Sequence, residues 1–318
     1  MIVVTGAGGF IGSALCVHLR ARGRPFIGTV RKMGKAISSD LQPVGDLASL
    51  SDTALEDIVG GADAIIHLAG RAHVMRETEH DPASVYRRAN VDLTARLAAI
   101  AARTGVGRFV LASTVKVNGE RTVPGAPFQP GDVADPQDAY ARSKHEAERA
   151  LFEASEGTTM FPVALRVPLI YGRNAKGNFP KLVEAVVAGR RLPLASIRNQ
   201  RSLLYLGNLV EALEAVTIAP ALAGHVHFVA DAEAVSTPDL VRSIAVAWKV
   251  KPKLFAFPPL LLRAGATLIG KGNAVARLTD SLEVDTSAFR ATTRWTPRWS
   301  LDAALARCAS QHRQAPMF

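Results

Sequence analysis

Residues 5–12 read TGAGGFIG, with glycines at positions 6, 8, 9 and 12. The preceding residues 2–5 are mostly β-branched and apolar, which is typical of a buried strand. After the turn, Ile11, Leu15 and Leu19 recur every fourth residue, as on one face of a helix. Such a turn aims backbone N–H groups and the positive end of the helix dipole at one point, and glycine lets a diphosphate come close. The stretch therefore predicts a dinucleotide site, and the alternative is a tight strand-to-helix connection without a ligand.

Strand and helix patterns alternate along the first half of the chain. Strands are expected at residues 25–30, 63–70, 108–114 and 162–172, with helical stretches between them. This order implies an α/β fold, namely a Rossmann-type doubly wound parallel sheet covered by helices on both faces. Ligands of such sheets bind outside the carboxyl ends of the strands.

The pattern changes after Gly172, where the elements become shorter and proline and basic residues become more frequent. We expect a dinucleotide-binding domain over residues 1–172, with parts of residues 202–250 packed back onto it. Residues 173–201 and 251–318 are expected to form a smaller C-terminal substrate domain.

Two segments of the second half have readable patterns. The stretch VSTPDLVRSIAVAW predicts a helix, with Thr237 as its N-cap and Pro238 at the first helical position. The most apolar stretch, FAFPPLLLRAGATLIG, is broken by Pro258, Pro259 and Arg263 and is shorter than the ~18 to 20 residues that a membrane span needs. We expect a core or substrate-domain helix there and no integral membrane segment, with an interfacial role left open.

The composition is that of a globular enzyme of about two domain-sized units. The chain has 318 residues, of which 48% are hydrophobic and 21% are charged. Its N-terminal apolar run is too short for a signal peptide. Only two cysteines occur, Cys16 and Cys308, which excludes a disulfide framework and fits a reducing cytoplasm. The eight histidines are dispersed, so no metal site is expected.

The net charge of +10 suits an anionic ligand such as a nucleotide diphosphate, and equally nucleic acid or an anionic membrane. The basic residues lie in short scattered groups, without interleaved aromatic residues or a nucleic-acid motif. Nucleic acid is therefore not an expected partner.

The stretch YARSK carries the strongest chemical signal. Of the four tyrosines, only Tyr140 is followed by a lysine four residues later, at Lys144. On a helix this spacing places both side chains on one face. An ammonium group that favours phenolate would make Tyr140 a proton shuttle near neutral pH, since a free phenol has a pKa of about 10. The alternative is an ordinary surface pair.

Several segments together carry a resemblance to a known family. The segments that carry it are, in chain order, TGAGGFIG, HLAG, LASTVKVNG, YARSK and LRVPLIYG. Through them the chain resembles the extended short-chain dehydrogenases, specifically the nucleotide-sugar epimerase/dehydratase group. The resemblance covers nearly the whole chain and is looser after Gly172, although NQRSLLYLGNL and WTPRWSLDAAL are also similar to the family's segments.

The resemblance implies a role for each matching residue. It implies dinucleotide binding by Gly6, Gly9, Phe10, Ile11, Gly12, Asp46, Leu47, Ala69 and Lys144. Tyr140 would be the general acid/base, Thr114 would hold the reacting oxygen, and Lys144 would bind the nicotinamide ribose. Substrate contacts are implied for Ser113, Asn178 and Arg201, the last of these at a phosphate. Asp46 is equally well explained as a helix cap. Asn178 and Arg201 are equally well explained as ordinary surface residues.

Two places depart from the family pattern. The tyrosine-glycine pair that usually follows the catalytic hydroxyl is Asn118-Gly119, and the same loop carries Lys116. The stretch VKVNGE instead resembles the branch that includes reductases of UDP-4-keto-6-deoxy-N-acetylglucosamine. After the second strand, the acid that holds the ribose hydroxyls in NAD-using relatives is replaced by Val30, and Arg31 follows, which suits the 2′-phosphate of NADP.

These positions lead us to expect a cytoplasmic oxidoreductase acting at C4 of a UDP-linked nucleotide-diphosphate sugar, with NADP favoured over NAD. The favoured reaction is reduction of a UDP-4-keto-6-deoxy-hexosamine for surface polysaccharide. One alternative is a 4-epimerase of UDP-glucose or UDP-N-acetylglucosamine. Another is a non-catalytic dinucleotide sensor, against which the intact Tyr140 and Lys144 argue. The resemblance also implies a homodimer through the helix that contains Tyr140.

Overall fold

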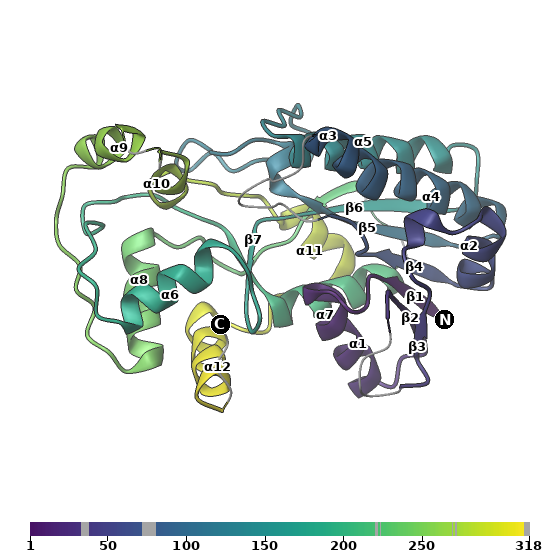
Figure 1. Cartoon of the computed structure of the whole chain (residues 1–318), viewed down its shortest axis with the longest axis horizontal. Helices are drawn as coiled ribbons and strands as arrows, with labels where there is room; N and C mark the ends of the chain where they lie inside the picture. The colour runs from purple at the N-terminus through teal and green to yellow at the C-terminus, as the bar shows by residue number, and fades with distance from the viewer. Residues whose placement is uncertain are drawn as a thin grey trace.

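A seven-stranded parallel sheet forms the centre of the larger part of the molecule (Figure 1). The computed structural model describes residues 1–32, 38–71, 81–219, 222, 224–268, 270 and 272–314. In spatial order the strands are β3 (Leu41–Pro43), β2 (Phe26–Val30), β1 (Ile2–Thr5), β4 (Ala64–His67), β5 (Arg108–Thr114), β6 (Phe161–Val167) and β9 (Val226–Phe228). The predicted Rossmann-type doubly wound fold is therefore confirmed.

Helices cover both faces of this sheet, because consecutive strand residues point to opposite sides. Val4 faces α1 (Phe10–Ala21) and α7 (Leu206–Ile218), whereas its neighbour Val3 faces the opposite core. That opposite core is formed with α2 (Asp52–Val59), α4 (Leu93–Arg103) and α5 (Ala139–Ser155). Figure 1 shows these two helix layers above and below the strands. Completely buried strands explain why their sequences read as continuous apolar runs.

The predicted strand over 162–172 is two separate strands. β6 ends at Val167 and stays in the large sheet, while β7 (Leu169–Tyr171) pairs with β8 (Leu203–Tyr205) in a second, two-stranded sheet. Pro168 lies between them, and a proline cannot donate a ladder hydrogen bond. The predicted strand 63–70 is also shorter, because β4 ends at His67.

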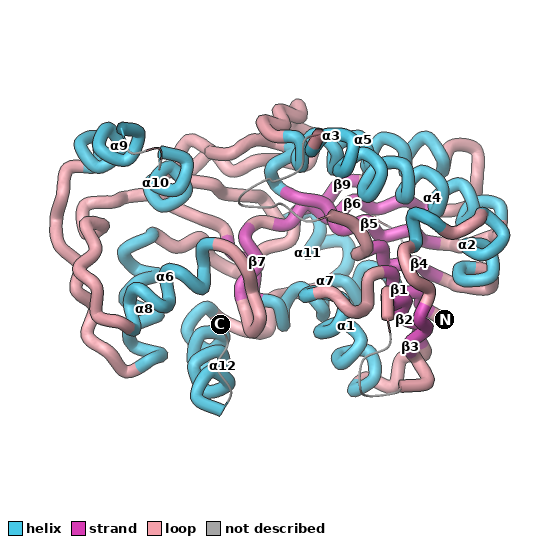
Figure 2. The backbone as a smooth tube through the Cα atoms, in the orientation of Figure 1, coloured by secondary structure: helices cyan, strands magenta, loops and turns pink. Residues whose placement is uncertain are grey.

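A second group of helices packs around the two-stranded sheet. α6 (Asn178–Val187), α8 (Thr237–Trp248) and α12 (Leu301–Gln314) share a third apolar core with β7 and β8. α9 (Pro259–Leu268) and α10 (Gly272–Thr279) pair with each other at the far end of the molecule (Figures 1 and 2). The remaining short helices are α3 (Pro82–Tyr86), η1 (Leu47–Ser49), η2 (Arg87–Asp92), η3 (Val115–Val117) and α11 (Ser287–Thr293).

The predicted cap of α8 is wrong by one residue. Ser236 is the N-cap, and its hydroxyl accepts a hydrogen bond from the Asp239 N–H at 3.2 Å. Thr237 is the first helical residue, and its hydroxyl instead donates to the Leu278 carbonyl at 2.8 Å. Ser and Thr are both favoured N-cap residues, and the contact of Thr237 with the neighbouring segment leaves the cap to Ser236.

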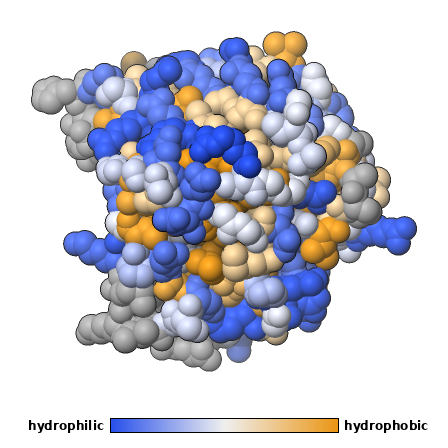
Figure 3. Space-filling model, turned by 90° about the vertical axis from the view of Figure 1, so that its right-hand side faces the viewer, coloured by the Kyte–Doolittle hydropathy of each residue, from blue (hydrophilic) through white to orange (hydrophobic). Residues whose placement is uncertain are grey.

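The surface is mixed in character. On the face shown in Figure 3, hydrophilic side chains gather over the upper part, and apolar ones appear between them in the middle. Within the residues that the structure describes, no helix is both long enough and apolar enough to cross a membrane.

Candidate active site

The glycine turn between β1 and α1 is shaped first by the chain's own backbone. Gly6 has a φ of +71°, and a Cβ there would lie 2.7 Å from the Ala69 nitrogen. A Cβ on Gly12 would lie 2.2 Å from the Gly6 carbonyl oxygen. These two glycines are needed for the turn to close. Gly8 and Gly9 are exposed, and a Cβ on Gly8 would meet only Val30, at 3.6 Å.

The N-terminus of α1 is suited to an anion. Gly9 occupies the N-cap position, so no side chain caps the helix, and the first turn holds no acidic residue. The first N–H groups of a helix have no partner within it, and its dipole favours negative charge there. The residues present therefore fit the diphosphate of a dinucleotide.

The end of β4 lies directly against this turn. The Ala69 N–H donates to Thr5 Oγ1 at 3.2 Å, and His67 Nδ1 lies 2.7 Å from the same oxygen. Burial, together with the positive charge of Lys144, lowers the pKa of His67 to about 3. His67 is thus a neutral packed strand residue, while Ala69 borders the turn with its backbone.

The other predicted cofactor residues lie beyond β2 and β3. Val30 is buried at the end of β2, and Arg31 next to it is exposed. Asp46 caps η1, because its carboxylate accepts from the Ala48 N–H at 3.3 Å. Leu47 is buried in the core between the sheet and α2. The helix-cap explanation of Asp46 therefore holds, whatever further contact it makes.

Tyr140, Lys144 and Thr114 meet at the carboxyl edge of the sheet. Tyr140 lies in the first turn of α5, and its phenol is hydrogen-bonded to the hydroxyl of Thr114, the last residue of β5. Its ring packs against that of Tyr86 with centroids 5.9 Å apart. Lys144 is buried one turn later, and this burial lowers its pKa to about 8.

The protonation of Tyr140 differs from the sequence-based expectation. Burial raises the pKa of the phenol, the negative charge of Asp138 raises it further, and the hydrogen bond with Thr114 acts in the opposite direction. The net shift is therefore upward, opposite to the lowering that was expected from Lys144. In this structure Tyr140 is a neutral phenol, ready to donate a proton.

Ser113 belongs to a buried ionic network behind the site. Its hydroxyl donates to Glu148 of α5, which also accepts two hydrogen bonds from Arg166 of β6, at 3.0 and 2.6 Å. Arg166 donates in addition to Asn118 Oδ1 at 2.9 Å. Burial acts to raise the pKa of Glu148, but hydrogen bonding with His145, Arg166 and Ser113 and the guanidinium charge hold it below its usual range. Asn118, one of the two departures from the family pattern, therefore supports the strands and does not line the cavity.

A cavity of about 740 Å³ opens in front of Thr114 and Tyr140. Its walls come from the turn residue Phe10, the segment after β6, the start of α6 and the end of α10. The three residues predicted to contact substrate, Ser113, Asn178 and Arg201, all line it. Cationic side chains surround it, namely Arg71, Lys116, Lys176, Arg201 and Arg277. Such a cavity suits a ligand that has apolar or stacked parts and an anionic diphosphate.

Sequence reasoning missed Lys176 and Arg277 as cavity residues. Each is one of the 38 lysines and arginines of the chain, and no motif distinguishes it. Arg277 lies on α10 and comes close to Arg201. Burial, together with the smaller effect of the Arg277 charge, lowers the pKa of Arg201 to about 10, although the charge of Glu120 acts in the opposite direction. Only the packing of α10 against the mouth of the cavity brings the two together.

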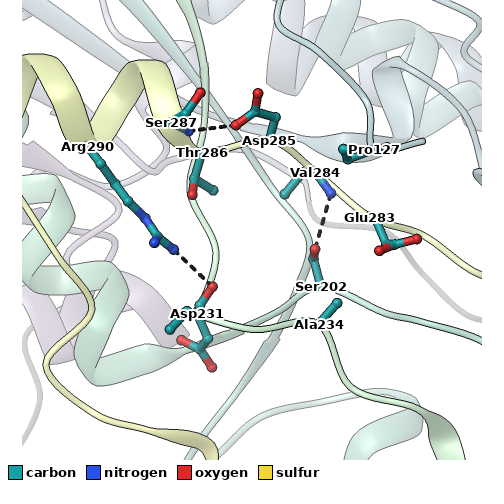
Figure 4. A pocket seen from close by; sticks show the side chains of 11 residues that line it. Pro127, Ser202, Asp231, Ala234, Glu283, Val284, Asp285, Thr286, Ser287 and Arg290 are labelled. Atoms are coloured by element: carbon teal, nitrogen blue, oxygen red, sulfur yellow. Dashed lines mark hydrogen bonds between the residues drawn. The ribbon is translucent and has the colours of Figure 1, made fainter. Parts of the chain in front are cut away.

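A second cavity, of about 390 Å³, lies on the other side of the segment 281–284 (Figure 4). Its polar groups are occupied with one another, since the Ser287 N–H donates to Asp285 at 2.7 Å and the Val284 N–H donates to Ser202 at 3.1 Å. Arg290 donates to the Asp231 carbonyl at 3.3 Å. Thr114 and Tyr140 line the larger cavity, and Lys144 is buried one helical turn after Tyr140. Among the described residues, no group of three or more His, Cys, Asp or Glu is arranged to hold a metal ion.

The fold and the site together define a class. A glycine turn at the first strand of a doubly wound sheet, with a Tyr/Lys pair and a hydroxyl at the sheet edge, is the arrangement of a dinucleotide-dependent enzyme that moves a proton at a substrate oxygen. Residues 2–228 match the NAD dependent epimerase/dehydratase family, and the chain belongs to that family. It is therefore an enzyme of this family, which sets aside the dinucleotide sensor.

Three relatives show the range of the similarity. A UDP-glucose 4-epimerase from Vibrio cholerae is 34% identical over 318 residues, which cover 99% of this chain and 96% of the relative. A 2-alkyl-3-oxoalkanoate reductase from Stenotrophomonas maltophilia (strain K279a) is 30% identical over 77% of this chain and 75% of its own length. Among solved structures, MoeE5 in complex with UDP-glucuronic acid and NAD superposes with a TM-score of 0.78, at 25% identity and over 99% of both chains.

Proposed function

We propose that the protein is a UDP-hexose 4-epimerase. The observation that carries this proposal is the 34% identity, over 99% of the chain, to a UDP-glucose 4-epimerase. It replaces our favoured expectation of a 4-keto-sugar reductase. That expectation rested partly on Asn118. This residue is buried against Arg166 and does not line the cavity.

The side chains at the sheet edge suit this reaction. When bound, the nicotinamide dinucleotide supplies the hydride acceptor and donor for C4. In its ionised form Tyr140 would take the proton from the C4 hydroxyl, and the neutral phenol would return it after the sugar has turned over. Thr114 would hold the same oxygen by a hydrogen bond, and Lys144, one helical turn from the phenol, would bind the cofactor ribose. Positioned proton transfer of this kind contributes roughly 10² to 10⁴ in rate.

The remaining predicted residues have binding roles in this proposal. Gly6, Gly9 and Gly12, with the amides of Phe10 and Ile11, would hold the cofactor diphosphate. Asp46 and Leu47 would bind at the adenine and Ala69 at the nicotinamide. Asn178 and Arg201 bind the nucleotide sugar, with Arg201 at a phosphate, and Ser113 supports them through the network behind the site.

A single incubation tests the reaction. Purified protein is given NAD and either UDP-glucose or UDP-N-acetylglucosamine, while the sugar is analysed by NMR and the reduced cofactor by its absorbance. An epimerase converts the sugar without net change in reduced cofactor. The second candidate, reduction of a UDP-4-keto-6-deoxy-hexosamine, is supported by Lys116 in the cavity wall. A reductase would leave both UDP-hexoses unchanged in this incubation; given the 4-keto sugar and reduced cofactor instead, it would consume the reduced cofactor in proportion to product.

The choice between NADP and NAD depends on the end of β2. Val30 cannot accept hydrogen bonds from the ribose hydroxyls, and Arg31 is exposed beside it. We propose a preference for NADP on this basis. A charge-assisted bond to the 2′-phosphate, of about 1.5 to 3 kcal/mol, predicts that Arg31→Ala loses roughly 10- to 150-fold in NADP affinity and little in NAD affinity. Equal or tighter NAD binding by the wild type would contradict the preference.

Assembly, location and domain division complete the proposal. A homodimer through α5 is proposed from the family resemblance, and sedimentation velocity tests it. A cytoplasmic location is proposed because Cys16 and Cys308 are both buried free thiols.

The division into residues 1–172, 173–201 and 251–318 also stays a proposal. β9 and α7, from residues 202–250, contact the large sheet and α1 respectively, and α11 packs against β9.

A further inference from the structure

The outer face of α9 is apolar throughout. Leu260, Leu261 and Leu268 have 79%, 61% and 88% of their surface exposed, and Ala264 and Gly265 are exposed as well. At 3.6 residues per turn, these five residues fall within an arc of about 140° of the helix. A surface helix normally turns charged or polar side chains to water. α9 does the reverse and presents a continuous apolar surface.

The opposite side of α9 is fixed to the rest of the molecule. Ala266 is buried, and Leu262 packs against the apolar core around β7 and β8. The charged residue of the helix, Arg263, is directed at the end of α10, where its guanidinium donates to Thr279 Oγ1 at 3.0 Å and pairs with Asp280. These contacts hold α9 beside α10, and they keep the leucine face turned outward.

The segments next to α9 are cationic. Residues 185–210 and 240–279 contain no aspartate or glutamate. The two stretches lie side by side before α9 begins, because the Leu192 N–H donates to the Lys253 carbonyl at 2.9 Å. Figure 1 shows the second stretch running along the end of the molecule opposite the N-terminus and leading into α9. The exposed basic side chains at the junction of the two stretches are Arg190, Arg191, Lys249, Lys251 and Lys253.

An exposed apolar helix face beside an acid-free basic segment fits one kind of partner best. The boundary of a bilayer with anionic lipids offers acyl chains to leucine side chains and negative charge to lysine and arginine. A second copy of this chain would bring two cationic surfaces together, and like charges across an interface repel. Nucleic acid would pair with the charges through its phosphates and leave the leucines in water.

We propose that α9 and the basic segments beside it dock the protein on the surface of an anionic membrane. The helix lies in the plane of the interface, with its exposed leucines among the acyl chains and the basic side chains at the headgroups. α10, which pairs with α9, supplies Arg277 and Leu278 to the wall of the larger cavity, so the docked protein takes in its substrate close to the bilayer. The proposal does not depend on which reaction the site catalyses.

Co-sedimentation of the full chain with lipid vesicles tests the docking. The vesicles contain phosphatidylglycerol and phosphatidylcholine in equal amounts, or phosphatidylcholine alone. The protein should bind the anionic vesicles about 10-fold or more tightly, and added salt should reduce this difference, because it screens the charges. Binding to neither kind of vesicle, or equal binding to both, would contradict the proposal.

Substitutions on α9 test whether this helix is the docking face. Leu260→Ser combined with Leu268→Ser should weaken binding to the anionic vesicles by roughly 10- to 100-fold, because two leucines no longer leave water. Val17→Ser combined with Ile218→Ser replaces two similarly exposed apolar side chains on α1 and α7 and should leave the affinity unchanged. The same affinity in both double variants would exclude α9 as the docking face.

A second pair of variants tests the basic segment. Lys251→Gln combined with Lys253→Gln should weaken binding by about 10- to 30-fold, since each cation near an anionic surface contributes about 5-fold. Arg22→Gln combined with Arg103→Gln changes the net charge equally at exposed positions next to α1 and α4. An equal loss in both variants would mean that the net charge alone draws the protein to the vesicles.

Two further measurements distinguish a membrane from a protein partner. In Leu261→Trp the tryptophan emission should move to shorter wavelength when anionic vesicles are added, beyond any change in the wild type, because the new side chain enters the acyl region. An unchanged emission would contradict the proposal. Sedimentation velocity without lipid is the other measurement: self-association that Leu260→Ser combined with Leu268→Ser abolishes would show that a second copy covers α9, and would overturn the membrane assignment.

Discussion

At the residue scale, two neighbouring hydroxyls have different tasks. Ser113 and Thr114 end the same strand, and either could serve as the catalytic hydroxyl by residue type alone. In the structure Ser113 donates to the buried Glu148, while Thr114 bonds the phenol of Tyr140. A hydroxyl committed to a buried carboxylate cannot easily be released to a substrate, because the carboxylate would lose a hydrogen bond without water to replace it.

The two hydroxyls should therefore respond differently to removal. Thr114→Val is expected to lower kcat by about 10² with little change in melting temperature, since it loses a bond to the reacting oxygen. Ser113→Ala should cost about 1 to 3 kcal/mol of stability and much less activity, because it leaves Glu148 underbonded. Kinetics and thermal unfolding of both variants check this. A larger loss of kcat in Ser113→Ala would transfer the role to Ser113.

Tyr140 itself should be indispensable for turnover but not for cofactor binding. Tyr140→Phe removes the proton that the buried phenol carries, and kcat should fall by ~10² to 10⁴. The dissociation constant of NAD, measured by calorimetry, should change little. Tyr86→Phe, which keeps the ring contact, serves as the control. Near-wild-type turnover by Tyr140→Phe would refute the mechanism.

At the scale of elements, the β1–α1 turn separates a structural from a ligand-facing use of glycine. A Cβ at position 12 would lie 2.2 Å from the Gly6 carbonyl oxygen, which is too close for any side chain. A Cβ at position 8 would lie 3.6 Å from Val30, which is an ordinary van der Waals distance. Backbone cannot move away as a flexible side chain can, so the two glycines are not equivalent.

This difference predicts opposite outcomes for the same substitution. Gly12→Ala should destabilise the fold by roughly 3 to 5 kcal/mol or prevent folding, because the turn cannot close over a Cβ. Gly8→Ala should fold with a loss below about 1 kcal/mol and show its effect, if any, in NAD affinity. Circular dichroism melts and NAD titrations of both variants measure this. Equal stability of the two variants would show that the turn relaxes.

The pair of Glu148 and Arg166 joins α5 to β6, and its contribution depends on pH. The folded-state pKa of Glu148 is below its ordinary value. Its contribution to stability is therefore complete above the unfolded pKa of about 4.3 and is lost as the pH falls through the folded value. Removing one partner leaves a buried charge uncompensated.

Arg166→Met should accordingly cost about 3 to 5 kcal/mol at neutral pH. The difference from the wild type should shrink in acid, where Glu148 is protonated in the variant and no longer needs the guanidinium. Urea unfolding between about pH 4 and pH 7 tests this, because carboxyl groups titrate across that range. A difference independent of pH would show that the loss comes from packing alone.

At the scale of the whole molecule, the cavity exists only because distant segments converge. Its walls combine Phe10 from the first turn, the ends of β5 and β6, the start of α6, and α10. Arg201 and Arg277 come from separate segments and face the same space. Together the two guanidinium groups suit a diphosphate, because two charge-assisted contacts bind it more tightly than one.

Arg277 should thus contribute to substrate affinity and not to cofactor affinity. Arg277→Ala is expected to raise KM for the UDP-sugar by about 10- to 100-fold, in line with the loss of one charge-assisted contact. The NAD dissociation constant should stay unchanged. Arg242→Ala, at an exposed arginine of α8 paired with Asp239, provides the control for net charge. If both substitutions raised KM equally, Arg277 would act only through the net charge of the protein and not through a direct contact with the substrate.

The sequence by itself determined the doubly wound sheet, the glycine turn and the Tyr140/Lys144 pair, because each depends on spacing along a single strand, turn or helix. Local spacing predicts which side chains share a face, and it identified the positions that meet at the sheet edge. Spacing and residue type alone could not rank Thr114 above Ser113, which only the family resemblance did, nor could they foresee that Asn118 lies behind the site or find Arg277. Those outcomes were decided by the tertiary structure, since a hydrogen-bond partner or a cavity wall comes from segments far apart in the chain. The same holds for the protonation of Tyr140, which depends on burial and on the charge of Asp138, and neither effect can be seen in a five-residue motif.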